Sequence, residues 1–81
     1  MTDEFLTMFI DNLKSIFPYE IDKYFMLYNT GTTGWSKAFI KTCDDLKMDT
    51  LREEYTTLDW EEFDFSCAEL GKIIVEKGLV N

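Results

Sequence analysis

The side chains of this sequence that could carry out covalent or metal chemistry are two cysteines and sixteen carboxylates, with no histidine. Histidine is the commonest general base and metal ligand, and it usually activates a cysteine nucleophile. Cys43 and Cys67 do not form a CxxC pair, and two cysteines without histidine cannot complete a structural zinc site. The sequence therefore predicts no catalytic residue, no metal site and no cofactor.

The carboxylates do not have the spacing of a catalytic or calcium-binding site. Asp59, Glu61 and Asp64 lack the ligand pattern and the central glycine of a calcium loop. Neighbouring acids such as Glu53 and Glu54 point about 100° apart on a helix, so they do not converge. We therefore expect the chain not to be an enzyme, and its acids to form either a solvated face or a binding surface.

Phosphate and nucleic-acid binding are also disfavoured. The segment from Gly31 to Lys37 combines glycines with a lysine, but it departs from the phosphate-binding loop, in which Gly, Lys and Ser or Thr are adjacent. A loop followed by a helix cap explains it better. Direct nucleic-acid binding usually requires a basic patch. The bases in the first half of the chain are instead spread among acids: Lys14, Lys23, Lys37 and Lys41.

The distribution of charge is the most unusual feature. The net charge is −8, and residues 44–69, with ten acids and two bases, account for all of it. Helices that begin near residues 50 and 59 would display six of these acids together, around the aromatic side chain of Phe65: Glu53, Glu54, Glu61, Glu62, Asp64 and Glu69. Such a surface attracts a positively charged partner. We therefore predict that these seven residues bind a basic protein surface.

In size and acidity the chain resembles small phage-encoded inhibitors of host nucleases, glycosylases or CRISPR effectors. The resemblance implies an inhibitor of the anti-CRISPR or DNA-mimic kind, whose carboxylates replace phosphates in the nucleic-acid channel of its partner. Two alternatives stay open. The charge could simply keep the protein soluble, or the chain could be a self-associating structural module, for example a homodimer. The interface aromatic and apolar residues would then be Phe65, Ile73, Trp35 and the tyrosines.

Length and composition predict a single all-α domain over residues 1–81, built as a compact bundle of four or five short helices. A chain of 81 residues with 46% hydrophobic residues can bury one modest core. It has no apolar run near the roughly 18 residues that a membrane span needs, and its N-terminus is acidic where a signal peptide would be basic. We therefore expect a cytoplasmic protein. Its cysteines would be buried free thiols, although a bridge between them stays open.

The longest predicted helix lies between Leu58 and Leu79. Asp59 and Glu62 have the spacing of a capping box, and Gly78 suits the left-handed position after the helix. One apolar stripe is predicted to face the core: Trp60, Phe63, Cys67, Leu70 and Ile74. Phe65 projects to the opposite side, where either another element covers it or it is exposed among acids.

The first two helices are predicted on either side of Pro18. Thr2 would cap the first helix, and Pro18 would end it and begin the next segment. For residues 19–29 the apolar spacing favours a helix, although the apolar run at 24–28 also fits a short buried strand.

Two more helices are predicted before the last one. Thr33 would cap the third, and Thr50 with Glu53 would form a capping box at the start of the fourth. A break near Leu58–Asp59 is expected, because a straight helix from 50 to 77 would need two unrelated apolar faces. The alternative is one long helix with partners on two sides.

Overall fold

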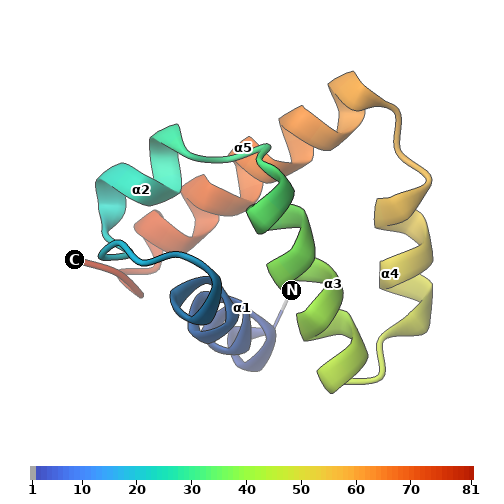
Figure 1. Ribbon diagram of the computed structural model, residues 1–81, viewed down its shortest axis with the longest axis horizontal. Helices are drawn as coiled ribbons and strands as arrows, with labels where there is room; N and C mark the ends of the chain where they lie inside the picture. The colour runs from blue at the N-terminus through green and yellow to red at the C-terminus, as the bar shows by residue number, and fades with distance from the viewer. Residues whose placement is uncertain (1) are drawn as a thin grey trace.

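The computed structural model describes residues 2–81, and these form five α-helices (Figure 1). Their bounds are α1 Asp3–Ile16, α2 Lys23–Tyr28, α3 Thr33–Asp45, α4 Asp49–Thr56 and α5 Trp60–Glu76. The prediction of an all-α fold is confirmed. The alternative strand at 24–28 is wrong, because residues 2–81 contain no strand and these five residues lie in α2. Asp22 caps this helix by accepting a hydrogen bond from the backbone N–H of Phe25 at 2.9 Å.

The centre of the core is the contact between α1 and α3. Four fully buried aromatic rings meet there, mostly edge to face: Phe5, Phe9, Trp35 and Phe39. This geometry is favoured because the positive ring edge meets the negative ring face. A buried polar contact joins the same helices, since Asn12 Nδ2 donates to Thr42 Oγ1 at 2.9 Å.

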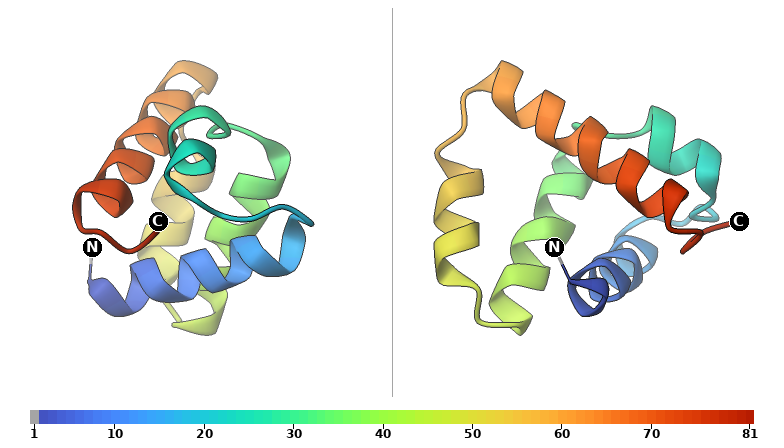
Figure 2. Two further views of the ribbon diagram at one scale, coloured as in Figure 1. Left: turned by 90° about the vertical axis from the view of Figure 1, so that its left-hand side faces the viewer. Right: turned by 180° about the vertical axis from the view of Figure 1, so that it is seen from behind.

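The second contact is between α2 and the C-terminal half of α5 (Figure 2). Gly71 makes the close approach possible, because a Cβ at this position would overlap the backbone carbonyl oxygen of Met26. The helix ends as predicted: Gly78 has φ +70°, and the N–H of Leu79 donates to the carbonyl oxygen of Ile74 at 3.3 Å. The C-terminal half of α5 is therefore held by both packing and a Schellman ending.

Helix α4 packs on α3 through stacked rings, because the centroids of Phe39 and Tyr55 are 3.7 Å apart. The predicted break before α5 is confirmed and the single long helix is wrong, since α4 ends at Thr56 and α5 begins at Trp60. The capping box is present: Asp59 Oδ1 accepts from the Glu62 N–H at 2.9 Å, and Glu62 Oε1 accepts from the Asp59 N–H at 3.3 Å. The two helices diverge from this corner (Figure 2, right).

Three predicted helix starts are wrong. Pro18 ends α1 but does not begin α2, which starts after the Asp22 cap, and α3 is capped by Thr32 rather than Thr33. The expected capping box at Thr50 does not form. Lys47 adopts φ 55°, and the N–H of Met48 donates to the Cys43 carbonyl oxygen, so the chain turns there and α4 begins at Asp49.

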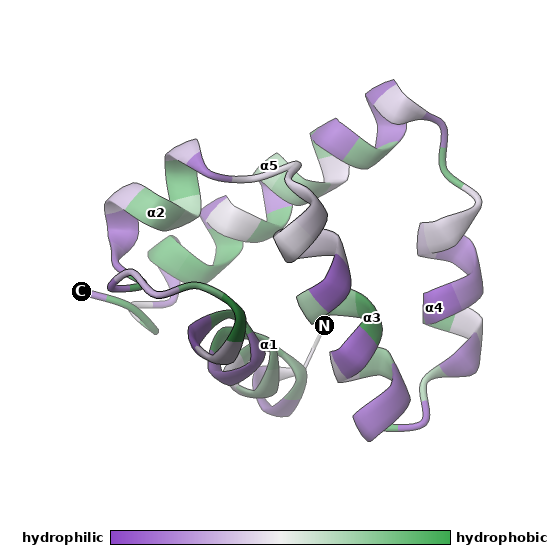
Figure 3. Ribbon diagram, in the orientation of Figure 1, coloured by the Kyte–Doolittle hydropathy of each residue, from purple (hydrophilic) through white to green (hydrophobic). Residues whose placement is uncertain are grey.

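Within residues 2–81, no helix is long and apolar enough to cross a membrane. The helices differ strongly in their polarity. Hydrophilic positions extend along most of α4, whereas the last turns of α5 are largely hydrophobic (Figure 3). The polar helix α4 and the polar start of α5 therefore form one margin of the fold.

Candidate functional site

The predicted core stripe of α5 is buried over its second half. Cys67, Leu70 and Ile74 are buried, Phe63 is half-buried, and Trp60 is 71% exposed. The prediction that Trp60 belongs to the core is therefore wrong. The physical reason is that α2 covers the C-terminal half of α5, and the first turn extends beyond it. There the Trp60 ring stacks beside the Phe63 ring, with centroids 6.2 Å apart.

Phe65 lies on the opposite side of α5 and is 67% exposed. The alternative that another element covers it is therefore wrong. Helical periodicity places its ring between Glu61 on one side and Glu69 on the other, with Lys72 close by. An exposed phenylalanine surrounded by charged side chains is a candidate contact residue.

Two shallow hollows adjoin at Ser66, one between α4 and α5 and the other along α5, and together they define the α4–α5 groove. The first, of about 250 Å³, is lined by Leu51, Glu54, Tyr55, Leu58 and Ser66. The second, of about 230 Å³, is lined by Phe65, Ser66, Glu69, Leu70 and Ile73. Ser66 belongs to both, so the two hollows adjoin. The walls are mainly apolar, and the two charged side chains that border them are Glu54 and Glu69.

The structure brings only part of the predicted acidic set to this groove. Glu54 and Glu69 line it together with Phe65. Glu53 points about 100° away from Glu54 on α4. The Glu61 side chain points about 80° away from Glu69 around the axis of α5, on the far side of Phe65.

Glu62 and Asp64 have other contacts. Glu62 completes the capping box with Asp59. Asp64 lies against Gly31 in the turn between α2 and α3, about 140° around the helix from Glu69. Of the six acids predicted to be displayed together, Glu54 and Glu69 line the groove, and the others point in different directions because successive side chains on a helix spread around its axis.

The acids at this margin are poorly neutralised. Two acids of α3 are in ion pairs, Asp44 with Arg52 at 3.0 Å and Asp45 with Lys41 at 3.3 Å. On α5, Glu69 lies 3.6 Å from Lys72. Among the described residues of the 44–69 segment, seven acids have no Lys or Arg nitrogen within 4.0 Å: Asp49, Glu53, Glu54, Asp59, Glu61, Glu62 and Asp64. A negative potential therefore surrounds the groove.

A buried cluster beneath the groove joins α4 to α5. The Tyr55 hydroxyl and the Cys67 sulfur are 2.9 Å apart and share a hydrogen bond. Burial raises the pKa of both groups above their ordinary values, and hydrogen bonding to Cys67 raises that of Tyr55 further. The indole Nε1 of Trp35 is also buried, and it has no hydrogen-bond partner within residues 2–81. Its N–H lies near the Tyr55 hydroxyl and lowers the pKa of Tyr55, which partly offsets the effect of burial.

The cysteines are free and buried. A bridge between Cys43 and Cys67, which the sequence left open, is therefore wrong for this structure. Burial raises the pKa of the Cys43 thiol, with a further contribution from Asp44. A protonated, buried thiol is a poor nucleophile. Among the described residues, no group of three Cys, Asp or Glu side chains converges to hold a metal ion.

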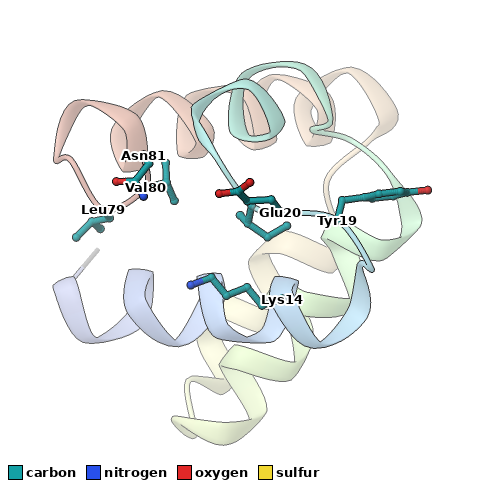
Figure 4. A pocket seen from close by; sticks show the side chains of 7 residues that line it. Lys14, Tyr19, Glu20, Leu79, Val80 and Asn81 are labelled. Carbon is teal, nitrogen blue, oxygen red and sulfur yellow. The ribbon is translucent and has the colours of Figure 1, made fainter.

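Two other hollows are less distinctive than the groove. The larger, of about 330 Å³, lies between α1 and the end of the chain and is lined by Lys14, Tyr19, Glu20, Ile21, Leu79, Val80 and Asn81. Figure 4 shows Lys14 along α1 and Glu20 in the segment above it, while Tyr19 points away. Opposite charges therefore face the same space. The smaller, of about 260 Å³, lies beside Trp60 and Phe63 and is otherwise lined by Gly31, Thr32, Thr33 and Ser36.

Sequence reasoning missed most of the groove's apolar walls. Leu51 and Leu58 are seven residues apart and so lie on one side of a helical pattern, but nothing in the sequence places that side beside Ser66. The available signal was on α5, where Phe65 and Ile73 are both apolar at outward positions.

Comparison with protein-family models, with curated proteins and with solved structures found no match to this chain.

Proposed function

We propose that this chain is a small acidic protein-binding module that contacts a positively charged surface of a partner protein through the α4–α5 groove. The observation that carries the proposal is an apolar groove beside exposed Phe65, bordered by Glu54 and Glu69. Interfaces commonly combine an apolar centre with a polar rim. The proposed surface has both parts on adjoining helices.

The charge supports a basic partner. Residues 44–69 carry the whole net charge of −8, and most of the acids at the groove margin lack a cationic neighbour in the described chain. Such a surface accelerates encounter with a basic groove and disfavours acidic partners. A surface that served solubility alone would not need an exposed phenylalanine among its acids.

The specific form of the proposal is an inhibitor that occupies the nucleic-acid-binding surface of its partner. Its carboxylates would replace phosphates, as in a DNA mimic, and a phage-encoded inhibitor of a nuclease or CRISPR effector is one such protein. Small size and concentrated negative charge support this version. We place the activity in the cytoplasm, since buried free thiols are typical of reducing compartments.

Affinity capture at low and high salt tests the proposal. The immobilised chain should retain a basic protein at low salt and release it at high salt, and heparin should compete. Reversing Glu54 and Glu69 to lysine should weaken the purified interaction more than reversing Asp11 and Glu20, which changes the net charge equally. Salt-insensitive binding, or equal effects of the two double variants, would contradict the proposal.

Self-association is the second candidate, and α2 supplies the observation that favours it. Tyr24 and Tyr28 are each 69% exposed, with ring centroids 4.6 Å apart, and Leu27 is also exposed. Trp35 was predicted as an interface residue of this candidate, but it is fully buried and cannot contact a second copy. Light scattering at high concentration discriminates the two functions, because a strict monomer contradicts self-association.

A further inference from the structure

The α4–α5 groove has a graded apolar surface. Leu70 and Tyr55 are buried at its floor, Leu51 and Leu58 are half-buried in its wall, and Ile73 is 40% exposed at its edge. Exposed apolar surface of this kind gains free energy when a partner removes it from water.

From this geometry we infer that the segment that enters the groove is a basic amphipathic α-helix of a partner protein. The inference rests on the proposed function and names the chemistry of its partner. Such a helix would place two apolar side chains in the two hollows and its lysines or arginines beside Glu54 and Glu69.

The backbone of the groove favours a helix over an extended peptide. Apart from Leu58, the lining residues of both hollows lie on α4 or α5, where backbone groups are paired, and residues 2–81 contain no strand edge to which a peptide could add. An extended segment would therefore press unpaired N–H and C=O groups against apolar side chains, which is costly. A helix satisfies its own backbone and can present one apolar face.

The spacing of the hollows suits helical anchors. Ser66 lies where they adjoin, and the second hollow continues along α5 to Ile73, about 10 Å further. Each hollow, of about 250 and about 230 Å³, has room for one large apolar side chain. On one face of a helix, residues three or four apart lie about 5–6 Å apart and residues seven apart lie about 10 Å apart, so two side chains of one helix can enter adjoining hollows of this extent.

The charge of the groove favours a basic helix over a second copy of this chain. The two groove acids lie on different helices, Glu54 on α4 and Glu69 on α5. Cations on both flanks of an apolar stripe would therefore each find a carboxylate. A second copy would instead bring another net charge of −8 toward the same margin.

The test uses a fluorescent peptide of leucine and lysine designed as an amphipathic helix. Two control peptides share its charge: one has the same composition scrambled to remove the apolar stripe, and one has serine for leucine. Fluorescence anisotropy with the full chain should show binding that is at least about tenfold tighter for the amphipathic peptide than for either control. The affinity should also fall with salt.

Matched variants of the protein locate the contact. Phe65→Ser should weaken peptide binding about tenfold, whereas Tyr24→Ser, at an equally exposed aromatic on α2, should leave it unchanged. Glu54→Lys should weaken it about tenfold, whereas Glu53→Lys, an identical charge change outside the groove, should weaken it about twofold. Circular dichroism confirms that each variant is folded.

The outcomes separate this inference from the proposed function. Equal binding of the amphipathic and scrambled peptides, or equal effects of Glu53→Lys and Glu54→Lys, would overturn the helix-in-groove inference while leaving a general acidic binding surface intact. Failure of the capture experiment, with no salt-sensitive protein partner, would overturn the proposed function itself. Loss of peptide affinity in Tyr24→Ser equal to that in Phe65→Ser would place the contact outside the groove.

Discussion

The two halves of α5 follow the same apolar periodicity but have different surroundings. In the C-terminal half, Leu70, Gly71 and Ile74 are buried and α2 packs directly on the helix. In the N-terminal half, Trp60 is exposed and the helix depends on its capping box. The comparison shows that an amphipathic stripe identifies the side of a helix that can be buried. The neighbouring helix decides how much of that side is actually buried.

This difference also separates stability from binding within one helix. The C-terminal half contributes to the core, where close packing makes side-chain volume critical. The N-terminal half contributes acids and, at Phe65, an exposed ring to the α4–α5 groove. Four measurements can break or sharpen this division. Two compare substitutions in α5, one concerns the buried thiol of Cys67, and one concerns the capping box at the start of the helix.

Gly71→Leu should have the largest effect on stability. Its side chain would overlap the Met26 carbonyl oxygen, so α2 would have to move, and we expect a loss of about 3 kcal/mol or more in the free energy of unfolding. Lys72→Leu places the same residue at the next, exposed position and should change stability by less than about 0.5 kcal/mol. Urea denaturation measures both. Similar losses would mean that α2 does not pack closely on α5.

Ile74→Ala compared with Trp60→Ala tests the stripe directly. Removing the buried isoleucine should cost about 3 kcal/mol, because it leaves a cavity in the core. Removing the larger but exposed tryptophan should cost less than about 1 kcal/mol. Thermal and urea unfolding provide the comparison. An equal cost would show that the first turn of α5 is packed as well as the last.

Alkaline pH should destabilise the protein through Cys67. Burial raises the pKa of this thiol in the folded state above the ordinary value of 9.0. Above that pH the unfolded chain loses the proton and the folded chain keeps it, so stability is complete below about pH 9 and is lost as the pH rises. Each such group contributes about 1.4 kcal/mol per pH unit.

Cys67→Ser checks the assignment, because serine can keep the hydrogen bond to Tyr55 but does not titrate. In this variant, the free energy of unfolding measured in urea should fall less steeply with rising pH, because one titrating group is missing. An unchanged slope would show that the thiol ionises equally in the folded and unfolded chains.

Asp59→Ala should have the smallest effect of the four. It removes the carboxylate that caps α5, and a loss of about 1 kcal/mol is expected. Asp49→Ala, in the first turn of α4 but outside the N-cap, should cost only a few tenths of a kcal/mol. If the two substitutions were equivalent, the capping box would not be what holds the exposed start of α5.

Local signals predicted much of the fold. The break between α4 and α5 and the caps at Thr2 and Asp59 depend on residues three or four apart, so the sequence contains the whole interaction. The predicted starts of α2, α3 and α4 were wrong by one or more residues. At α4 the reason is a turn at Lys47, whose left-handed conformation is unusual for a residue with a side chain.

The candidate site was predicted less completely. The sequence identified seven residues, and the structure gathers three of them, Glu54, Phe65 and Glu69, around the α4–α5 groove. Asp64 lies instead against Gly31, a contact between segments far apart in the chain. Helical periodicity alone would have separated Asp64 from Glu69, but it could not place either beside another helix.

The sequence by itself determined the helical character, the principal caps and the concentration of negative charge in residues 44–69, because each depends on composition or on neighbours within about one helical turn. The tertiary structure alone decided that α2 covers one half of α5, that Trp60 is exposed and that an apolar groove lies between α4 and α5. These features depend on which side chains from distant segments exclude water together, and a pattern along one helix does not contain that information.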